Sequence, residues 1–421
     1  MTRQVSAASA TLFRVGFGLV GFVLCARFLA HGWVDSLLIE PEFHFTYPGL
    51  GWVEPLPGVG MHIVVGMMSL AALAIMLGFR HRIAAVIFGV GLAYVELIDR
   101  TNYLNHYYWM VLTALVLATL PVDRMWSVDA HFDRTAGRSP LLSMWVVWVL
   151  RFQVGMVYFF AGIAKLNPDW LFRAEPLSTW LPARGDMALV GPLLTLPATA
   201  YVLSLLGVFF DLTVVAWLLI RRTRLVAYLA LVGFHLSTWL LFPSIGVFPL
   251  LMSFGALVFF DPDWPLRWAK RPVRAEAGSP GTLHPAGVVL VSIYVLAMLV
   301  VPLRHFFIPG DVRWTGEGYQ GSWQVMLTDK TGSVEFVATN EEGSWTVPTP
   351  DYLTNRQIAV MATDTGMIEQ MARVIAEETD AVISARAEVA FNGRRRRPLT
   401  DPTVAITDQH VLRSDWVVAA P

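Results

Sequence analysis

Residues 141–166 read LLSMWVVWVLRFQVGMVYFFAGIAKL, a run of 26 residues in which only Arg151 and Lys165 are charged. As a helix rising 1.5 Å per residue, this run would be about 39 Å long. That length is enough to cross a hydrocarbon core about 30 Å thick. The stretch therefore predicts a transmembrane helix.

Similar apolar runs recur through the chain. Of its 421 residues, 55% are hydrophobic and 15% are charged, whereas a soluble domain has about 25% charged residues. We expect a polytopic α-helical membrane protein of about nine transmembrane helices, with spans near 9–30, 60–79, 83–99, 104–120, 141–166, 190–219, 225–242, 244–260 and 285–303. The net charge of −1 and the lack of a basic domain give no indication of a nucleic-acid partner.

The positive charges predict the orientation of these spans. With the N-terminus inside, the inner segments carry 13 Lys and Arg residues: Arg3, Arg80, Arg82, Arg124, Arg134, Arg138, Arg221, Arg222, Arg224, Arg267, Lys270, Arg271 and Arg274. The outer loops before residue 304 carry only Arg100, Arg173 and Arg184. Inner loops of membrane proteins are enriched in Lys and Arg. Nine crossings divide the chain into a transmembrane domain, 1–303, and an extracytoplasmic domain, 304–421.

The outer domain has the pattern of a small α+β fold. GSWQVML (321–327) and SVEFVAT (333–339) predict strands, separated by the turn residues TDKTG. Residues 355–380 have helical apolar spacing, and AVISARAEVAF (381–391) alternates like a strand. In the following loop, Arg394 to Arg397 form either a solvated hairpin tip or a contact with lipid headgroups. Cys25 is the only cysteine, so no internal disulfide can form.

Ionisable groups inside membrane spans are costly and mark functional sites when they face the protein interior. The candidates are Arg14, Arg27, Glu96, Arg151, Lys165, Asp211 and His235. Arg14, Arg27 and Asp211 can instead pair with one another or with backbone carbonyls. Arg151 lies ten residues into its span, too deep to reach the interface, so we expect an internal partner.

Two histidines have both a structural and a functional interpretation. His106 follows Asn105 in NYLNHYYW (102–109), which an aromatic belt at the membrane interface also explains. His235 has apolar neighbours and either hydrogen-bonds within the bundle or serves a site. The ten histidines are scattered, so no metal-binding motif is present, and no nucleotide or dinucleotide fingerprint occurs. A lipid-soluble cofactor would need none of these motifs.

Lys165 is the most informative of the charged residues. Ala161 and Gly162 occupy the positions one helical turn before it, so no carboxylate pairs with it there. One interpretation is a lysine whose ammonium snorkels to the interface. The other is a lysine turned into the bundle, where burial without a carboxylate disfavours the charged form. A neutral amine in an apolar pocket is a competent general base.

Several motifs in one order make the chain resemble a known family, the vitamin K-dependent γ-glutamyl carboxylases, whose membrane part is also called the horizontally transferred transmembrane domain. They include PLPGVGMHIVVGMMSLAALAIMLGF (55–79), NHYYW (105–109), VYFFAGIAKLNPDWL (157–171), FDPDWP (260–265) and PLRHFFIPGDVRWTGEGYQGSW (302–323). The resemblance runs from about residue 43 to the C-terminus.

The resemblance implies an enzyme that uses reduced vitamin K, either phylloquinol or menaquinol, with O2 and CO2 as co-substrates and no metal. Oxygenation of the quinol to its epoxide creates a strong base that removes a γ-proton from glutamate in a peptide or protein client, and the carbanion takes up CO2. Lys165 matches the residue that deprotonates the quinol, and Asn105 and His106 match a pair near that site. The other matching positions are Tyr158, His235 and Met326 for cofactor binding, and Tyr319, Trp323 and His305 for the glutamate side.

Three departures from the family pattern leave alternatives open. Ala164 replaces a second lysine, Thr328 replaces an expected histidine, and the family's animal members have a disulfide and a client-binding extension beyond this chain's last residue. The first hypothesis is a γ-carboxylase coupled to quinol epoxidation. The second is a quinol epoxidase or oxygenase without glutamate carboxylation. The third is a non-enzymatic membrane scaffold or immunity-type protein.

Overall fold

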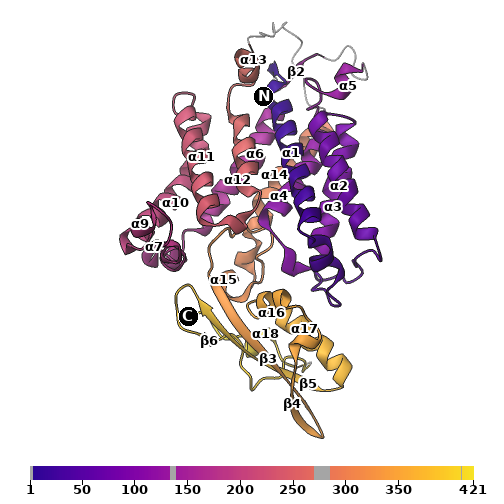
Figure 1. Ribbon diagram of the computed structural model, residues 1–421, viewed down its shortest axis with the longest axis vertical. Coiled ribbons are helices and arrows are strands. Elements are labelled where there is room, and N and C mark those ends of the chain that lie inside the picture. Colours follow the sequence, from indigo (N-terminus) through magenta and orange to yellow (C-terminus); the bar gives the residue numbers. More distant parts are fainter. Residues whose placement is uncertain (1–2, 133–138, 270–284, 409) are drawn as a thin grey trace.

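The computed structural model describes residues 3–132, 139–269, 285–408 and 410–421 of the chain. A helical bundle occupies one end, and a smaller domain built around a sheet occupies the other (Figure 1). Of the cations used to predict orientation, Arg134, Arg138, Lys270, Arg271 and Arg274 lie outside the described residues.

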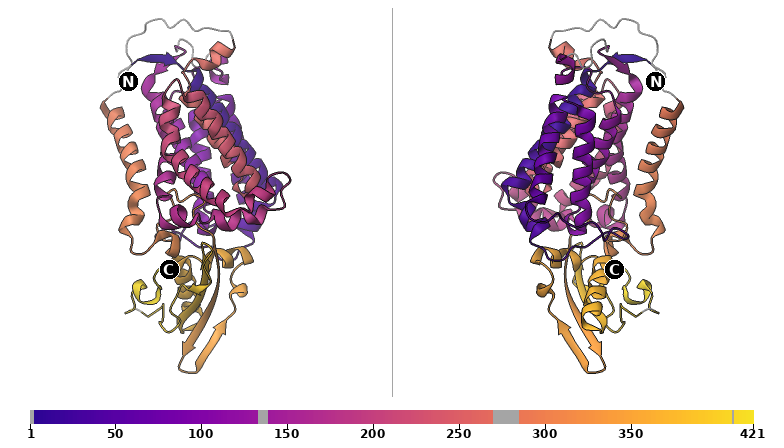
Figure 2. Two further views of the ribbon diagram at one scale, coloured as in Figure 1. Left: turned by 90° about the vertical axis from the view of Figure 1, so that its left-hand side faces the viewer. Right: turned by 90° about the vertical axis from the view of Figure 1, so that its right-hand side faces the viewer.

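Seven described helices are long and apolar enough to cross a membrane. They are α1 (Ala8–Ala30), α2 (Gly60–Leu77), α3 (His81–Ile98), α6 (Met144–Ala164), α10 (Pro197–Leu219), α11 (Arg224–Leu241) and Pro285–Phe307, in which α14 (Pro285–Val300) continues as η6 (Val301–Phe307). Two shorter helices occupy the other predicted spans: α4 (Asn105–Thr119) and the apolar helix Phe248–Phe259, composed of α12 (Phe248–Ala256) and η5 (Leu257–Phe259). Seven of the nine expected spans are therefore helices long enough to cross a membrane, and the other two are shorter. Figure 2 shows α14 at the edge of the bundle.

The inner end of the bundle is closed by short elements and buried arginines. β1 (Gln4–Ser6) pairs antiparallel with β2 (Leu141–Ser143). Arg14 donates to the carbonyl oxygens of Val122 and Met76. This agrees with the interpretation that Arg14 pairs with backbone carbonyls. Arg151 donates to three carbonyls at the end of η5, those of residues 258–260, so the internal partner expected for it is present. A buried guanidinium needs such acceptors because it loses its hydration.

Short helices connect these long elements. They are η1 (Asp35–Ile39), η2 (Arg100–Asn102), α5 (Val128–His131), α7 (Pro168–Arg173), α8 (Leu177–Trp180), η3 (Pro182–Arg184), α9 (Gly191–Leu194), η4 (Pro243–Ile245), α13 (Trp264–Trp268) and α15 (Val312–Thr315). Pro168 at the first turn of α7 and the Asn167 side chain that caps it make the chain turn sharply just after Lys165.

The outer domain is a four-stranded antiparallel sheet in the order β4-β3-β5-β6, packed against two helices. Its elements are β3 (Lys330–Asn340), β4 (Gly343–Val347), η7 (Thr349–Asp351), α16 (Asn355–Met361), α17 (Thr365–Thr379), β5 (Val382–Phe391), β6 (Arg397–Pro398) and α18 (Arg413–Trp416). The alternating pattern of 381–391 was correctly interpreted as a strand. The predicted helix 355–380 is two helices, because the chain turns at Asp364, whose side chain caps α17.

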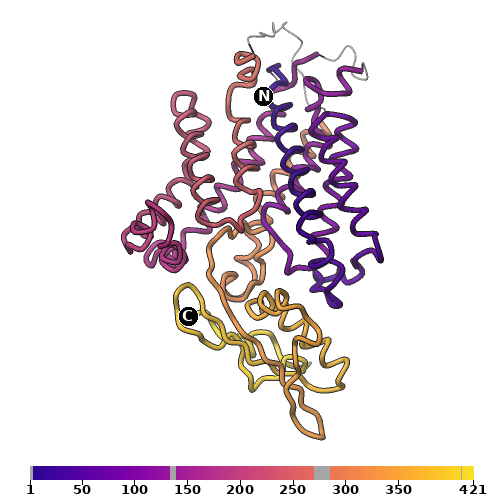
Figure 3. Tube along the Cα trace, viewed as in Figure 1, coloured from indigo at the N-terminus to yellow at the C-terminus, as the bar shows by residue number. Residues whose placement is uncertain are grey.

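One other expectation for the outer domain was wrong, and a second was wrong at one residue. Residues 321–327 form turns and extended chain, not a strand, and β3 begins only at Lys330. The connection from η6 through this segment to β3 can be followed in Figure 3. Arg395, Arg396 and Arg397 are exposed, as both interpretations expect. Arg394 is not part of the solvated tip, because its guanidinium hydrogen-bonds to Asp169 of α7 at 2.9 and 2.5 Å. The predictions failed because these residues are buried against the membrane domain, which a local pattern cannot reveal.

Candidate active site in the membrane domain

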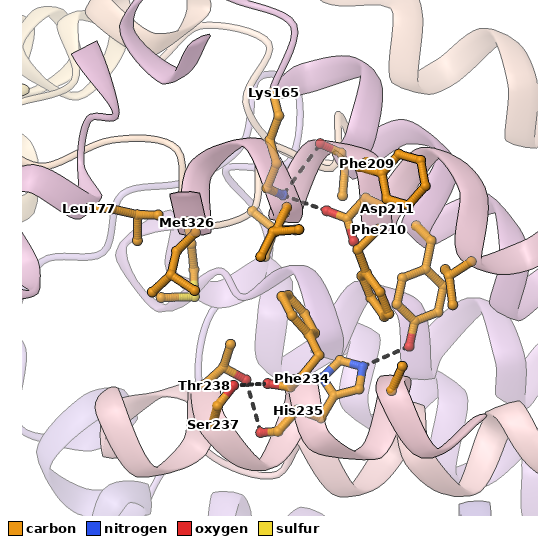
Figure 4. Close-up of a pocket in the computed structure, with 18 of the residues that line it drawn as sticks. Lys165, Leu177, Phe209, Phe210, Asp211, Phe234, His235, Ser237, Thr238 and Met326 are labelled. Carbon is orange, nitrogen blue, oxygen red and sulfur yellow. Dashed lines mark hydrogen bonds and ion pairs between the residues drawn. The ribbon is translucent and has the colours of Figure 1, made fainter. Parts of the chain in front are cut away.

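A cavity of about 450 Å³ lies among α6, α10 and α11, on the side of the bundle that faces the outer domain. Most of its walls are aliphatic and aromatic side chains, and Val325 and Met326 from the segment before β3 complete them. Four buried polar side chains, from Lys165, Asp211, Tyr158 and His235, line the same cavity. Figure 4 shows Lys165 and Asp211 turned toward each other and joined directly, with His235 on another helix nearby.

Lys165 and Asp211 form a buried ion pair. The ammonium nitrogen Nζ lies 2.7 Å from Asp211 Oδ2, and the two residues are 6% and 3% exposed. Nζ also lies 5.1 Å from the centre of the Trp170 ring, within the range of a cation–π contact. The expectation of a lysine without a carboxylate was therefore wrong. Asp211 likewise does not pair with Arg14 or Arg27.

The ion pair depends on a close helix crossing that the linear sequence does not display. A Cβ at Gly162 of α6 would lie 2.7 Å from the Leu212 side chain and 3.1 Å from the Leu212 backbone nitrogen. Glycine thus allows α10 to approach α6 at the position where Asp211 meets Lys165. A search for carboxylates one turn away on the same helix misses this partner, because Asp211 lies 46 residues later.

Tyr158 and His235 form the second polar pair in the cavity. The Tyr158 hydroxyl lies 2.7 Å from His235 Nε2, and both residues are buried. The other ring nitrogen, Nδ1, is buried without a hydrogen-bond partner among the described residues. A buried polar atom without a partner is costly and is typical of a site that receives a ligand. His235 can therefore offer Nδ1 to a bound oxygen.

Asn105 and His106 do not line the cavity but lie next to it. His106 sits in the first turn of α4, and its ring centre is 6.0 Å from that of Phe248. Phe248 lines the cavity and lies 5.7 Å from the His235 ring. One aromatic ring therefore separates the Asn-His pair from the pocket that contains Lys165.

The residues expected on the glutamate side occupy two different places. Tyr319 shares a side-chain hydrogen bond with Asn105, and burial raises the pKa of its phenol, which stays protonated. The Trp323 ring is buried in the bundle core, 5.6 Å from the ring of Tyr108. Met326, which was predicted for cofactor binding, lines the cavity together with Lys165.

His305 lies outside the cavity. Its Nδ1 is 2.8 Å from the carbonyl oxygen of Pro302, and its Cα and Cβ lie against Gly318, one residue before Tyr319. The structure thus brings Lys165, Tyr158, His235 and Met326 into one cavity. Asn105 and Tyr319 meet at the domain boundary nearby. Asp211 is the residue of the cavity for which sequence reasoning assigned the wrong partner.

Comparisons with family models identify both parts of the chain. Residues 2–264 match the HTTM domain, and residues 283–421 match the lumenal domain of vitamin K-dependent gamma-carboxylase. No solved structure matches the chain. Among the residues that the structure describes, no cluster of His, Cys, Asp and Glu is arranged to hold a metal ion. The C-terminal domain is lumenal by this match, which agrees with the charge bias and places it outside the cytoplasm. The protein is a multi-pass membrane protein of the vitamin K-dependent γ-carboxylase family.

Proposed function

We propose that this protein is a membrane enzyme that couples oxygenation of a reduced naphthoquinone, phylloquinol or menaquinol, to γ-carboxylation of glutamate. The observation that carries the proposal is the buried Lys165–Asp211 pair inside an apolar cavity of about 450 Å³. The family match supports reduced vitamin K as the cofactor. The glutamate-containing client is inferred from the family alone.

The shape of the cavity fits a ligand with a polar ring and an apolar tail. Leu206 and Val226 line it although they are 54% and 66% exposed. In a bilayer these faces of α10 and α11 meet lipid, so the cavity opens sideways into the hydrocarbon. The four polar side chains lie at the buried end. A quinol can therefore enter from the membrane with its ring first.

Each polar residue has a distinct proposed role. The reduced quinone, when bound with O2, supplies the strong base that removes the γ-proton before CO2 adds. Lys165 accepts the proton of a ring hydroxyl as it passes one of its own protons to the Asp211 carboxylate, 2.7 Å away, so the carboxylate finally holds the proton. His235 binds a ring oxygen through Nδ1 while Tyr158 fixes its Nε2. Asn105 and His106 position the ring from behind Phe248, and Met326 covers it.

We also propose nine crossings and a domain boundary between residues 303 and 304. The pairing of β1 with β2 supports a crossing by α4, since the chain must return from the outer end of α3 to the inner end of α1. Arg224 at the start of α11 donates to Asp261 at 2.9 Å, which supports a return crossing by Phe248–Phe259. Both helices are shorter than the roughly 20 residues that a straight crossing needs.

A second candidate function is quinol oxygenation without carboxylation, and one observation favours it. Trp323, expected beside the glutamate, is only 1% exposed and packs on Tyr108 inside the bundle. In this conformation its ring is not available to a peptide. Tyr319 and His305 remain closer to the outer domain and are the residues proposed to face the client.

One experiment separates the three hypotheses. Purified protein in lipid nanodiscs is supplied with phylloquinol or menaquinol and O2, and the epoxide is measured by chromatography. Incorporation of ¹⁴C-labelled CO2 into a short glutamate-containing peptide is measured in the same reaction. Epoxide with labelled peptide supports the coupled carboxylase, and epoxide alone supports the oxygenase. Folded protein that forms no epoxide from either quinol contradicts the carboxylase and the oxygenase hypotheses and leaves the scaffold hypothesis.

A further inference from the structure

The segment 321–329 reaches the cavity in an unusual conformation. It makes no strand pairing, yet it places Val325 and Met326 in the wall beside Lys165. Trp323 and Met326 have φ angles of +56° and +53°. Residues other than glycine adopt this left-handed region only when neighbouring contacts hold them there. Contacts with the rest of the protein must therefore hold the ends of the segment in place.

Asn392, in the turn after β5, anchors the end that leads into β3. Its side-chain oxygen accepts a hydrogen bond from the backbone nitrogen of Asp329 at 2.8 Å. Its own backbone nitrogen donates to the carbonyl of Asp329 at 2.9 Å. The carboxylate of Asp329 accepts a further hydrogen bond from the indole of Trp180, also at 2.9 Å. Asp329, which ends the segment, is thus fixed by three hydrogen bonds.

Asn392 is in turn attached to the membrane domain next to the lysine. Its amide nitrogen donates to Asp169 Oδ2 at 3.0 Å, and Asp169 follows Lys165 by four residues. Burial raises the pKa of Asp169, but hydrogen bonds from Arg394 and Asn392 outweigh that effect and keep it below its usual value. Asp169 is therefore a carboxylate at neutral pH. Asn392 itself is fully buried.

We propose that Asn392 is a positioning residue that holds Met326 over the quinone cavity by tying Asp329 to Asp169. The proposal rests on the proposed function, because the ligand that Met326 covers is the quinol. Lys165 and Met326 come from different domains, and this connection is one of the contacts that set the distance between them. The amide suits the position because it accepts from a backbone N–H on one side and donates to a carboxylate on the other. Asparagine also tolerates its φ of +46°.

Asn392→Asp tests the connection with little change of shape. The aspartate keeps an acceptor for Asp329 and tolerates the same backbone conformation, but it places a second carboxylate against Asp169. The matched variant Asn392→Asp/Asp169→Asn restores a donor facing an acceptor. Hydrogen exchange of residues 323–329 is measured by mass spectrometry in nanodiscs. Binding of phylloquinone is measured through quenching of tryptophan fluorescence, since Trp170 and Trp180 line the cavity.

We expect Asn392→Asp to accelerate exchange in 323–329 and to weaken phylloquinone binding by roughly 10- to 100-fold, the range for one hydrogen bond to a charged group. The double variant should recover only part of both losses, because it restores the bond between residues 392 and 169 but weakens the pairing of residue 169 with Arg394. Unchanged exchange in the single variant, or exchange that rises equally throughout the outer domain, would overturn the proposal. If the wild-type protein binds neither phylloquinone nor menaquinone, the proposed function fails, and exchange alone still decides whether Asn392 holds the segment.

Discussion

Removing the Lys165–Asp211 pair one partner at a time should separate its structural role from its chemical role. Asp211→Leu leaves the ammonium of Lys165 buried at 6% exposure without its carboxylate. Breaking a buried pair in this way costs about 3–5 kcal/mol of stability. Lys165→Met leaves the Asp211 carboxylate unpaired and should cost about the same. The double variant Lys165→Met/Asp211→Leu contains no buried charge, and such replacements are often neutral or stabilising.

Stability and activity should therefore respond differently to the same three variants. The apparent melting temperature in nanodiscs should fall in both single variants and return close to the wild-type value in the double variant. Quinol oxidation should fall about 10²–10⁴-fold in all three variants, because each variant removes a member of the pair that takes up the proton, and this is the effect typical of a lost general base. Ser237→Ala serves as a control, because Ser237 lines the cavity but hydrogen-bonds only within its own helix, to the carbonyl of Phe234.

One result would refute the reasoning about the pair. If the double variant oxidises quinol within a few-fold of the wild-type rate, Lys165 is not the base, and the ion pair only joins α6 to α10. A double variant that remains as unstable as the single variants would instead show that the cavity cannot accept two apolar side chains. In that case Lys165→Gln with Asp211→Asn, which keeps both shapes, provides the comparison.

Three further predictions concern other parts of the chain. Ser333→Cys in a Cys25→Ser background should be labelled in intact cells by a membrane-impermeant maleimide, because Ser333 is exposed in the outer domain. Labelling that occurs only after cell lysis would contradict the predicted orientation. His106→Ala should slow quinol oxidation less than Lys165→Met does, since the Phe248 ring separates His106 from the cavity. An equal loss of rate at saturating quinol would contradict a positioning role for His106. Burial lowers the pKa of Lys330 to about 8, so the unfolded chain binds more protons there between about pH 8 and 10.5 and stability should rise with pH across that window. Lys330→Gln should flatten this rise in thermal unfolding experiments, and an unchanged slope would show that another group causes it.

Much of the membrane architecture could be predicted because it depends on local transfer free energies. An apolar run such as 141–166 prefers the hydrocarbon core wherever its neighbours lie, and the arginines beside the runs indicate which ends stay inside. The same local logic identified the strand 381–391. It also identified Lys165 and Asp211 as costly intramembrane charges, without indicating that they are partners.

The errors came from residues whose neighbours are distant in the chain. The alternation in GSWQVML resembles a strand, but its apolar residues are buried in the bundle core and in the cavity wall. Arg394 follows a strand in a polar loop and nevertheless pairs with Asp169, 225 residues earlier. No local pattern contains either environment.

The sequence by itself determined that this protein spans a membrane, in which orientation it does so, and to which family it belongs, because hydropathy, charge bias and motif order are properties of short segments. Only the tertiary structure decided that Lys165 pairs with Asp211, that Met326 covers their cavity, and that Asn392 joins the two domains beside it. The physical reason is that hydrogen bonds and ion pairs form between atoms within about 3 Å of each other. That proximity is created by helix crossings and domain contacts between segments that the chain keeps far apart.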